Sequence, residues 1–121
     1  MRNFEKLVVF QEAHKLVLLV YKLSEKFPKS ELFGLTSQIR RAAVSICANI
    51  VEGNARKYIK EYLQFISLAI GSLEETKYHL LLAKDLGYIS DKEHIELQDQ
   101  AEHVGKLISG LVKYLKGKLK S

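Results

Sequence analysis

A chain of 121 residues with 47% hydrophobic and 27% charged residues has the composition of an ordinary globular protein, and we expect a single domain over 1–121. The longest uninterrupted apolar run, 16–21, is far shorter than the ~20 residues of a membrane span, and the N-terminus lacks a secretory pattern. The single cysteine, Cys47, excludes an internal disulfide. These features predict a cytoplasmic protein without membrane contact.

The charge is positive and unevenly distributed. The net charge of +5 and the isoelectric point near 9.3 favour an acidic partner, with nucleic acid as the first candidate. The last nine residues contain four lysines and no acid, and segment 54–60 is also basic. The alternative, with equal weight, is that these cations serve solubility and complement the dipole at a helix C-terminus.

Apolar spacing predicts two helices in the first half of the chain. The first covers 3–26, and Pro28 prevents its continuation. The second covers 31–53, with Ser30 or Thr36 as its N-cap.

The second half predicts two more helices with clear boundaries. The third covers 58–86 and ends at Gly87, and the fourth covers 91–118. Ser90 and Glu93 have the spacing of a capping box at the start of the fourth helix. Four long helices with short connections predict an all-α fold, an antiparallel up-down four-helix bundle.

Segment 35–53 is the most unusual of the four. Its apolar residues cover an arc of roughly 200°, whereas a helix packed on one core needs about 100°. We expect this helix, with Gly53 at its C-terminal end, to be buried on two sides, either centrally or against another copy of the chain. The fourth helix, in contrast, has a narrow apolar seam. The surplus apolar surface predicts a homo-oligomer. Its candidate interface residues are Ile39, Val44, Cys47, Asn49 and Val51.

A polar strip crosses this apolar helix. It can be a solvated face, or it can form hydrogen bonds across helices or between subunits. Arg40, which lies among apolar neighbours, is expected to extend its head to solvent or to pair with another group. The residues of the strip are Gln38, Arg41, Ser45, Asn49 and Glu52.

The sequence contains no pattern typical of an enzyme. Di-iron bundles need Glu-x-x-His pairs, but His79 follows Glu75 by four residues and His103 follows Asp99 by four. Cys47 lies in an apolar helical arc, where thiols are usually inert. Glycine-rich phosphate loops and zinc patterns are also missing. We therefore predict a protein without catalytic residues, metal or cofactor.

The basic segment 54–60 includes one aromatic residue. Tyr58 could serve as a stacking platform beside phosphate-binding cations, but it also begins the apolar stripe of the third helix, which favours a role in core packing. The candidate nucleic-acid-binding residues form several groups. They are Arg40, Arg41, Arg56, Lys57, Lys60, Lys113, Lys116, Lys118 and Lys120.

Segment 37–53 closely resembles the hallmark segment of the 23S rRNA intervening-sequence protein family. Segments 9–14, 27–35 and 69–75 resemble the same family, so the resemblance covers the first three helices well and the fourth by length and pattern. The resemblance implies a cytoplasmic bacterial four-helix bundle. It also implies kinship with the accessory protein of diversity-generating retroelements, a five-fold barrel with basic surfaces for nucleic acid and a reverse transcriptase.

Two positions depart from the family pattern. Phe10 stands where the family usually has Trp, and Cys47 where it usually has Pro. A residue other than Pro restores a backbone donor, so the second helix is expected to be straighter. Neither change threatens the fold.

Together these features predict a non-enzymatic ring-shaped homo-oligomer, a pentamer by family resemblance, that binds RNA or DNA mainly through phosphate contacts. The alternative is an oligomeric adaptor that presents its surface to a protein partner such as a polymerase or reverse transcriptase. Partners retained from a lysate after nuclease treatment would favour the adaptor.

Overall fold

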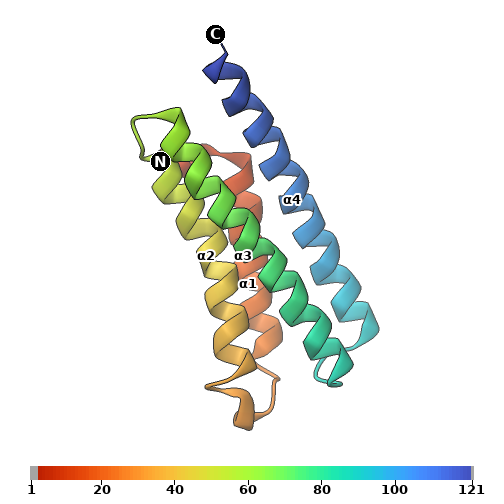
Figure 1. Ribbon diagram of the computed structural model, residues 1–121. Coiled ribbons are helices and arrows are strands. Elements are labelled where there is room, and N and C mark those ends of the chain that lie inside the picture. The colour runs from red at the N-terminus through yellow and green to blue at the C-terminus, as the bar shows by residue number, and fades with distance from the viewer. Residues whose placement is uncertain (1–2, 121) are drawn as a thin grey trace.

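The computed structural model describes residues 3–120 and consists of four antiparallel α-helices (Figure 1). Their bounds are α1 Val8–Ser24, α2 Leu35–Asn54, α3 Ile59–Asp85 and α4 Asp91–Leu119. Two short 3-10 helices, Asn3–Lys6 and Lys29–Glu31, precede α1 and α2. The family resemblance and the periodicity predicted this all-helical architecture.

The first two helices are shorter than predicted. The expected helix over 3–26 is divided at Leu7, whose extended backbone separates the 3-10 turn from α1. In the second helix neither Ser30 nor Thr36 is the N-cap, because α2 begins after Gly34. The Leu35 N–H instead donates to the Glu31 carboxylate at 3.1 Å.

Tyr88 also donates to Glu31, at 2.8 Å, and these two hydrogen bonds hold the pKa of this carboxyl below its usual range. The start of α2 is therefore fixed by a residue from the α3–α4 connection.

The boundaries of α3 and α4 lie within one residue of the prediction. Gly87 ends α3 with φ of +78°, a conformation that other residues rarely adopt. At the start of α4 the Glu93 N–H donates to Ser90 Oγ at 3.1 Å, and the Ser90 N–H donates to Glu93 Oε1 at 2.9 Å. This is the predicted capping box.

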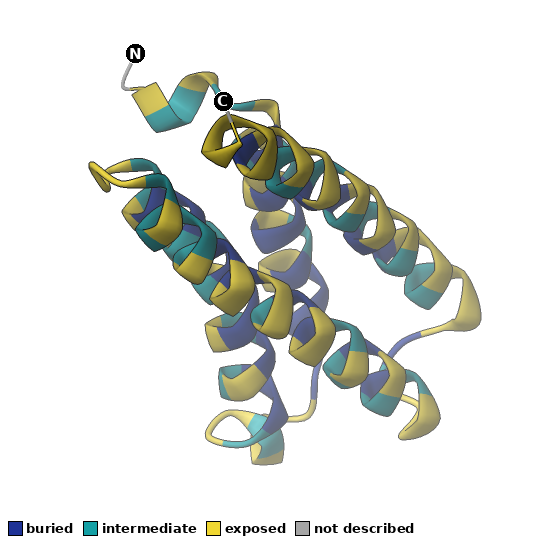
Figure 2. Cartoon of the chain, turned by 45° about the horizontal axis from the view of Figure 1, so that its top comes forward, coloured by how far each residue is buried: buried dark blue, intermediate teal, exposed yellow. Residues whose placement is uncertain are grey.

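Each helix packs on two neighbours around one core (Figure 2). α1 contacts α2 and α4, and α3 contacts the same two helices, while the pairs α1–α3 and α2–α4 do not meet within residues 3–120. The wide apolar arc of α2 is explained by this square arrangement, since α1 and α3 cover it from two sides. α2 is therefore not more central than the other helices.

Gly53 does not end α2 as predicted. It lies in the last turn of the helix, where α2 passes close to α3. A Cβ built on Gly53 would lie 2.9 Å from Cβ of Phe65 and 2.9 Å from Cδ1 of Tyr62. Gly53 thus makes room for the side chains that follow the α2–α3 turn.

Candidate nucleic-acid interface

The up-down order of the helices brings two distant basic segments to the same end of the bundle. The α2–α3 turn and the C-terminal end of α4 both lie at the top of Figure 1. Segments 3–6, 52–62 and 110–120, which form this end, contain eight lysines and arginines and three acids. The opposite end, formed by 22–34 and 84–96, contains five lysines and six acids. The excess positive charge is therefore concentrated at one end.

We call this surface the basic end. It contains seven of the nine cations predicted to bind nucleic acid. All seven are exposed. They are Arg56, Lys57, Lys60, Lys113, Lys116, Lys118 and Lys120.

At the α2–α3 turn, aromatic rings accompany the cations. The Arg56 guanidinium lies 4.5 Å from the ring centroid of Phe65, and Lys57 Nζ lies 5.7 Å from that of Tyr58. Tyr58 is the N-cap of α3 but provides no side-chain cap, and the residue is 60% exposed. The core-packing role favoured for Tyr58 is therefore wrong, because the apolar stripe of α3 begins only after the turn.

The end of α4 presents its cations on more than one face. Lys113, Lys116 and Lys120 line an open groove of about 500 Å³ together with Ser109, Val112 and Gly117. Lys118 lies on another side of the helix, 5.0 Å from the ring centroid of Tyr114. Tyr114 is 58% exposed. Sequence reasoning missed this tyrosine, although its position off the apolar seam and among lysines could have indicated it.

Arg40 and Arg41 lie elsewhere, toward the other end of α2. Arg40 is half-buried, as Nε donates to Ser24 Oγ at 2.8 Å and the guanidinium lies 4.7 Å from the ring centroid of Tyr21. Arg40 therefore ties α2 to α1. Arg41 is exposed. The structure does not bring these two arginines to the basic end.

Both arginines line a groove of about 540 Å³ between α1 and α2. Phe33 forms part of its wall and is 93% exposed, and Leu32, Val44 and Tyr21 in the same wall are each more than 40% exposed. We call this surface the Phe33 groove. Phe33 falls within the helix predicted over 31–53, but in the structure it lies in the turn before α2, so apolar periodicity could not indicate its exposure.

The predicted interface residues differ in their exposure. Ile39 is completely buried in the core of its own chain, so its assignment to an interface between copies is wrong. Val44 is exposed in the Phe33 groove, and Cys47, Asn49 and Val51 are half-buried along the edges of α2. The apolar arc of α2 contains both core residues and residues at the edge of the helix, and the sequence alone could not tell which were which.

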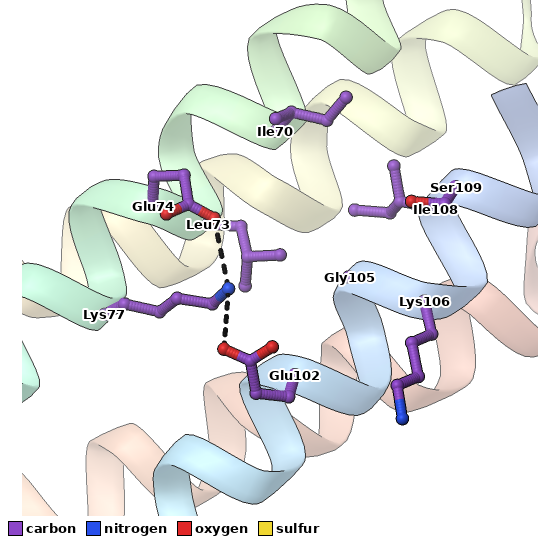
Figure 3. A pocket seen from close by; sticks show the side chains of 9 residues that line it. All are labelled: Ile70, Leu73, Glu74, Lys77, Glu102, Gly105, Lys106, Ile108 and Ser109. Carbon is purple, nitrogen blue, oxygen red and sulfur yellow. Dashed lines mark hydrogen bonds and ion pairs between the residues drawn. The ribbon is translucent and has the colours of Figure 1, made fainter.

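A smaller pocket of about 340 Å³ lies between α3 and α4 (Figure 3). Lys77 crosses it from α3 and pairs with Glu102 on α4 at 3.0 Å and with Glu74 at 3.1 Å. These ion pairs join two helices. Gly105 lines the same pocket, where α4 passes close to Leu73. The pocket is thus a packing feature of the α3–α4 pair.

Within residues 3–120, no three His, Cys, Asp or Glu side chains are grouped in a way that could hold a metal ion. In the same part of the chain, no helix is both long and apolar enough to cross a membrane.

The model of the 23S rRNA-intervening sequence protein family matches residues 5–110. The chain belongs to this family. The match includes the α2–α3 turn and most of α4, and it leaves Lys113, Lys116 and Lys120 beyond its end.

A solved structure supports the fold of this family member. A crystal structure from Bacteroides thetaiotaomicron, described as a protein of unknown function from the S23 ribosomal protein family, superposes with a TM-score of 0.78. The two sequences are 23% identical, and the similarity covers 88% of this chain and 99% of the other. At this identity the likeness shows the fold alone. None of the curated proteins matches the chain.

Proposed function

We propose that this family member is a non-enzymatic, cytoplasmic nucleic-acid-binding protein that holds RNA through phosphate contacts at the basic end. The concentration of eight cations against three acids at one end of the bundle carries this proposal. Lysine and arginine neutralise phosphates and release counterions, a source of binding that does not depend on sequence. The name of the family supports RNA as the first nucleic acid to test.

The test compares two triple variants that remove equal charge. One replaces Lys113, Lys116 and Lys120 with Gln at the basic end, and the other replaces Lys22, Lys29 and Lys92 at the opposite end. All six lysines are exposed, so both variants should fold. Binding of a labelled rRNA fragment is measured by fluorescence anisotropy at several salt concentrations.

We expect the basic-end variant to bind more weakly and to reduce the slope of log K against log salt by about 2, since each phosphate contact contributes about 0.7–0.9. The opposite-end variant should retain the slope of the wild type. Equal weakening by both variants would place binding elsewhere. Affinity that barely changes between low and moderate salt would contradict phosphate contacts altogether.

We further propose that copies of the chain assemble through the Phe33 groove. A phenylalanine that is 93% exposed beside other exposed apolar side chains is costly for a monomer. Arg41 adds positive charge to this surface, whereas another face of α3 presents exposed Glu75 two helical turns from exposed Leu68. Two different complementary faces form a head-to-tail contact, which closes into a ring when the rotation permits.

Light scattering of the purified protein tests this assembly. Phe33→Ser should lower the subunit number or make it depend on concentration. Ile95→Ser, at an equally apolar position on α4 that is 58% exposed, serves as the control and should not. A wild-type monomer would contradict the proposal. A stable oligomer unaffected by Phe33→Ser would show that the copies assemble through another interface. A protein partner that the wild type retains after nuclease treatment, and that Phe33→Ser no longer binds, would favour the adaptor.

A further inference from the structure

Two exposed tyrosines at the basic end lie next to lysines. Tyr58 is 60% exposed, and Lys57 Nζ lies 5.7 Å from the centroid of its ring. Tyr114 is 58% exposed, and Lys118 Nζ lies 5.0 Å from the centroid of its ring. One ring comes from the α2–α3 turn and the other from the last turns of α4. The same combination of ring and cation thus occurs on both elements that form the basic end.

Three other tyrosines have structural roles, which these two lack. Tyr88 donates a hydrogen bond to Glu31 at 2.8 Å, and the Tyr62 hydroxyl accepts one from Asn54 at 3.3 Å. Tyr21 lies under the guanidinium of Arg40. Tyr58 and Tyr114, in contrast, lie outside the core and are each more than half exposed.

We propose that the basic end binds single-stranded nucleic acid, with unpaired bases stacked on Tyr58 and Tyr114. A lysine next to a ring supplies the phosphate contact beside the stacked base, and stacking on an aromatic ring accepts every base because every base has a π-face. In a duplex the bases already stack on each other, and extruding one costs a few kcal/mol. A duplex therefore uses the lysines but not the rings.

This inference rests on the proposed nucleic-acid binding, and its test separates the two. The probes are a labelled 12-nucleotide single-stranded RNA and a 12-base-pair RNA duplex. The variants are Tyr58→Ala/Tyr114→Ala and Tyr58→Phe/Tyr114→Phe. Tyr78→Ala is the matched control, because Tyr78 is also 58% exposed but lies in the other half of α3.

We expect the double alanine variant to weaken single-strand binding by about tenfold or more per ring, and duplex binding by less than about twofold. The double phenylalanine variant should bind the single strand like the wild type, because the ring is retained. Tyr78→Ala should change neither affinity. Because the chain contains no tryptophan, tyrosine emission can be read directly and should be quenched by the single strand.

Equal loss of affinity for both probes, or no loss for either, would overturn the stacking proposal while leaving phosphate binding intact. A duplex that binds as tightly as the single strand would also overturn it. A wild-type protein that binds neither probe at low salt would overturn the proposed function as well. All three substituted tyrosines are exposed, so circular dichroism should show wild-type helix content in every variant.

Discussion

Ser72 on α3 donates a hydrogen bond to Ser45 on α2, with 2.9 Å between the two Oγ atoms. Asn49 also donates to Ser45, at 3.1 Å to Oγ and 2.8 Å to the backbone oxygen. All three residues are half-buried between α2 and α3, the helix pair with the most extensive contact within residues 3–120. This small network fixes how α2 and α3 face each other.

Removing the donor should weaken that contact. We expect Ser72→Ala to lower the free energy of unfolding by about 1 kcal/mol, since a hydrogen bond in a half-buried site contributes about that much. Urea denaturation measures the change. Ser67→Ala, at an exposed position on the same helix, is the control and should shift stability by no more than about 0.5 kcal/mol. Equal stability of the two variants would show that the network contributes nothing.

The polar strip of α2 shows what helical spacing can predict and what it cannot. The two alternatives were a solvated face and hydrogen bonds across helices, and the structure contains both. Ser45 and Asn49 lie toward α3 and take part in the network, while Gln38, Arg41 and Glu52 are exposed. Spacing places five residues on one side of a helix, but the position of the neighbouring helix decides which of them reach solvent.

Two glycines provide opposite outcomes from the same substitution. Gly53→Ala should destabilise the fold by about 1–3 kcal/mol, because the new Cβ would overlap Cβ of Phe65, an atom that cannot move without the backbone of α3. Gly71→Ala should stabilise the fold by about 0.5–1 kcal/mol, because Gly71 lies in the middle of the α3 helix and nothing is within 4 Å of the new Cβ.

Thermal denaturation of both glycine variants measures these changes. A gain at position 53 would contradict the close approach of α2 and α3, and a loss at position 71 would contradict the open surroundings of Gly71.

Helix ends were harder to predict than helix existence. A glycine at the end of an apolar pattern looks the same whether it supplies a positive φ, as Gly87 does, or space for a neighbour, as Gly53 does. The start of α2 depends on Glu31 and Tyr88, which are 57 residues apart. The capping box of α4 was predictable because both of its residues lie within one turn.

The link between Glu93 and Lys26 should make stability depend on pH. The hydrogen bond from Lys26, together with the Ser90 N–H, lowers the pKa of Glu93 to about 2. A carboxyl whose pKa is depressed by folding contributes stability that is fully present above its unfolded value near 4.5 and is lost as the pH falls toward 2. Glu93→Gln should therefore be less stable than the wild type at neutral pH.

The gap in urea midpoint between the wild type and Glu93→Gln should close as the pH falls from about 5 to about 2. A gap for Glu93→Gln that is constant over the same range would contradict the depressed pKa.

The basic end could be predicted in its parts and not as a whole. The sequence indicated segment 54–60 and the C-terminal lysines as two separate basic groups, and the antiparallel order of helices joins them. Arg40 stands among apolar residues in the sequence of α2. The structure explains this position, because the Arg40 guanidinium packs on the Tyr21 ring and donates a hydrogen bond to Ser24. The exposure of Phe33 could not be predicted, because the exposure of a side chain in a connection depends on how the whole chain folds.

Cys47 should be unreactive while the protein is folded. Its thiol packs against the core from the edge of α2, and burial raises its pKa to about 12. At a pH of about 8 almost none of it is thiolate, which is the reactive form, whereas an unfolded chain has a cysteine pKa of about 8.5. We expect labelling by a disulfide reagent to be at least about a hundredfold slower in buffer than in urea.

The same shift predicts a loss of stability in alkali. The folded state holds the thiol proton more tightly than the unfolded state, so folding becomes less favourable as the pH rises above about 8.5 toward 12. Cys47→Ala removes the titrating group and should lose less stability over this range than the wild type does. If Cys47 reacts equally fast in buffer and in urea, the thiol is accessible and the edge of α2 is open to solvent. Equal alkaline losses for both proteins would show that burial of Cys47 does not raise its pKa.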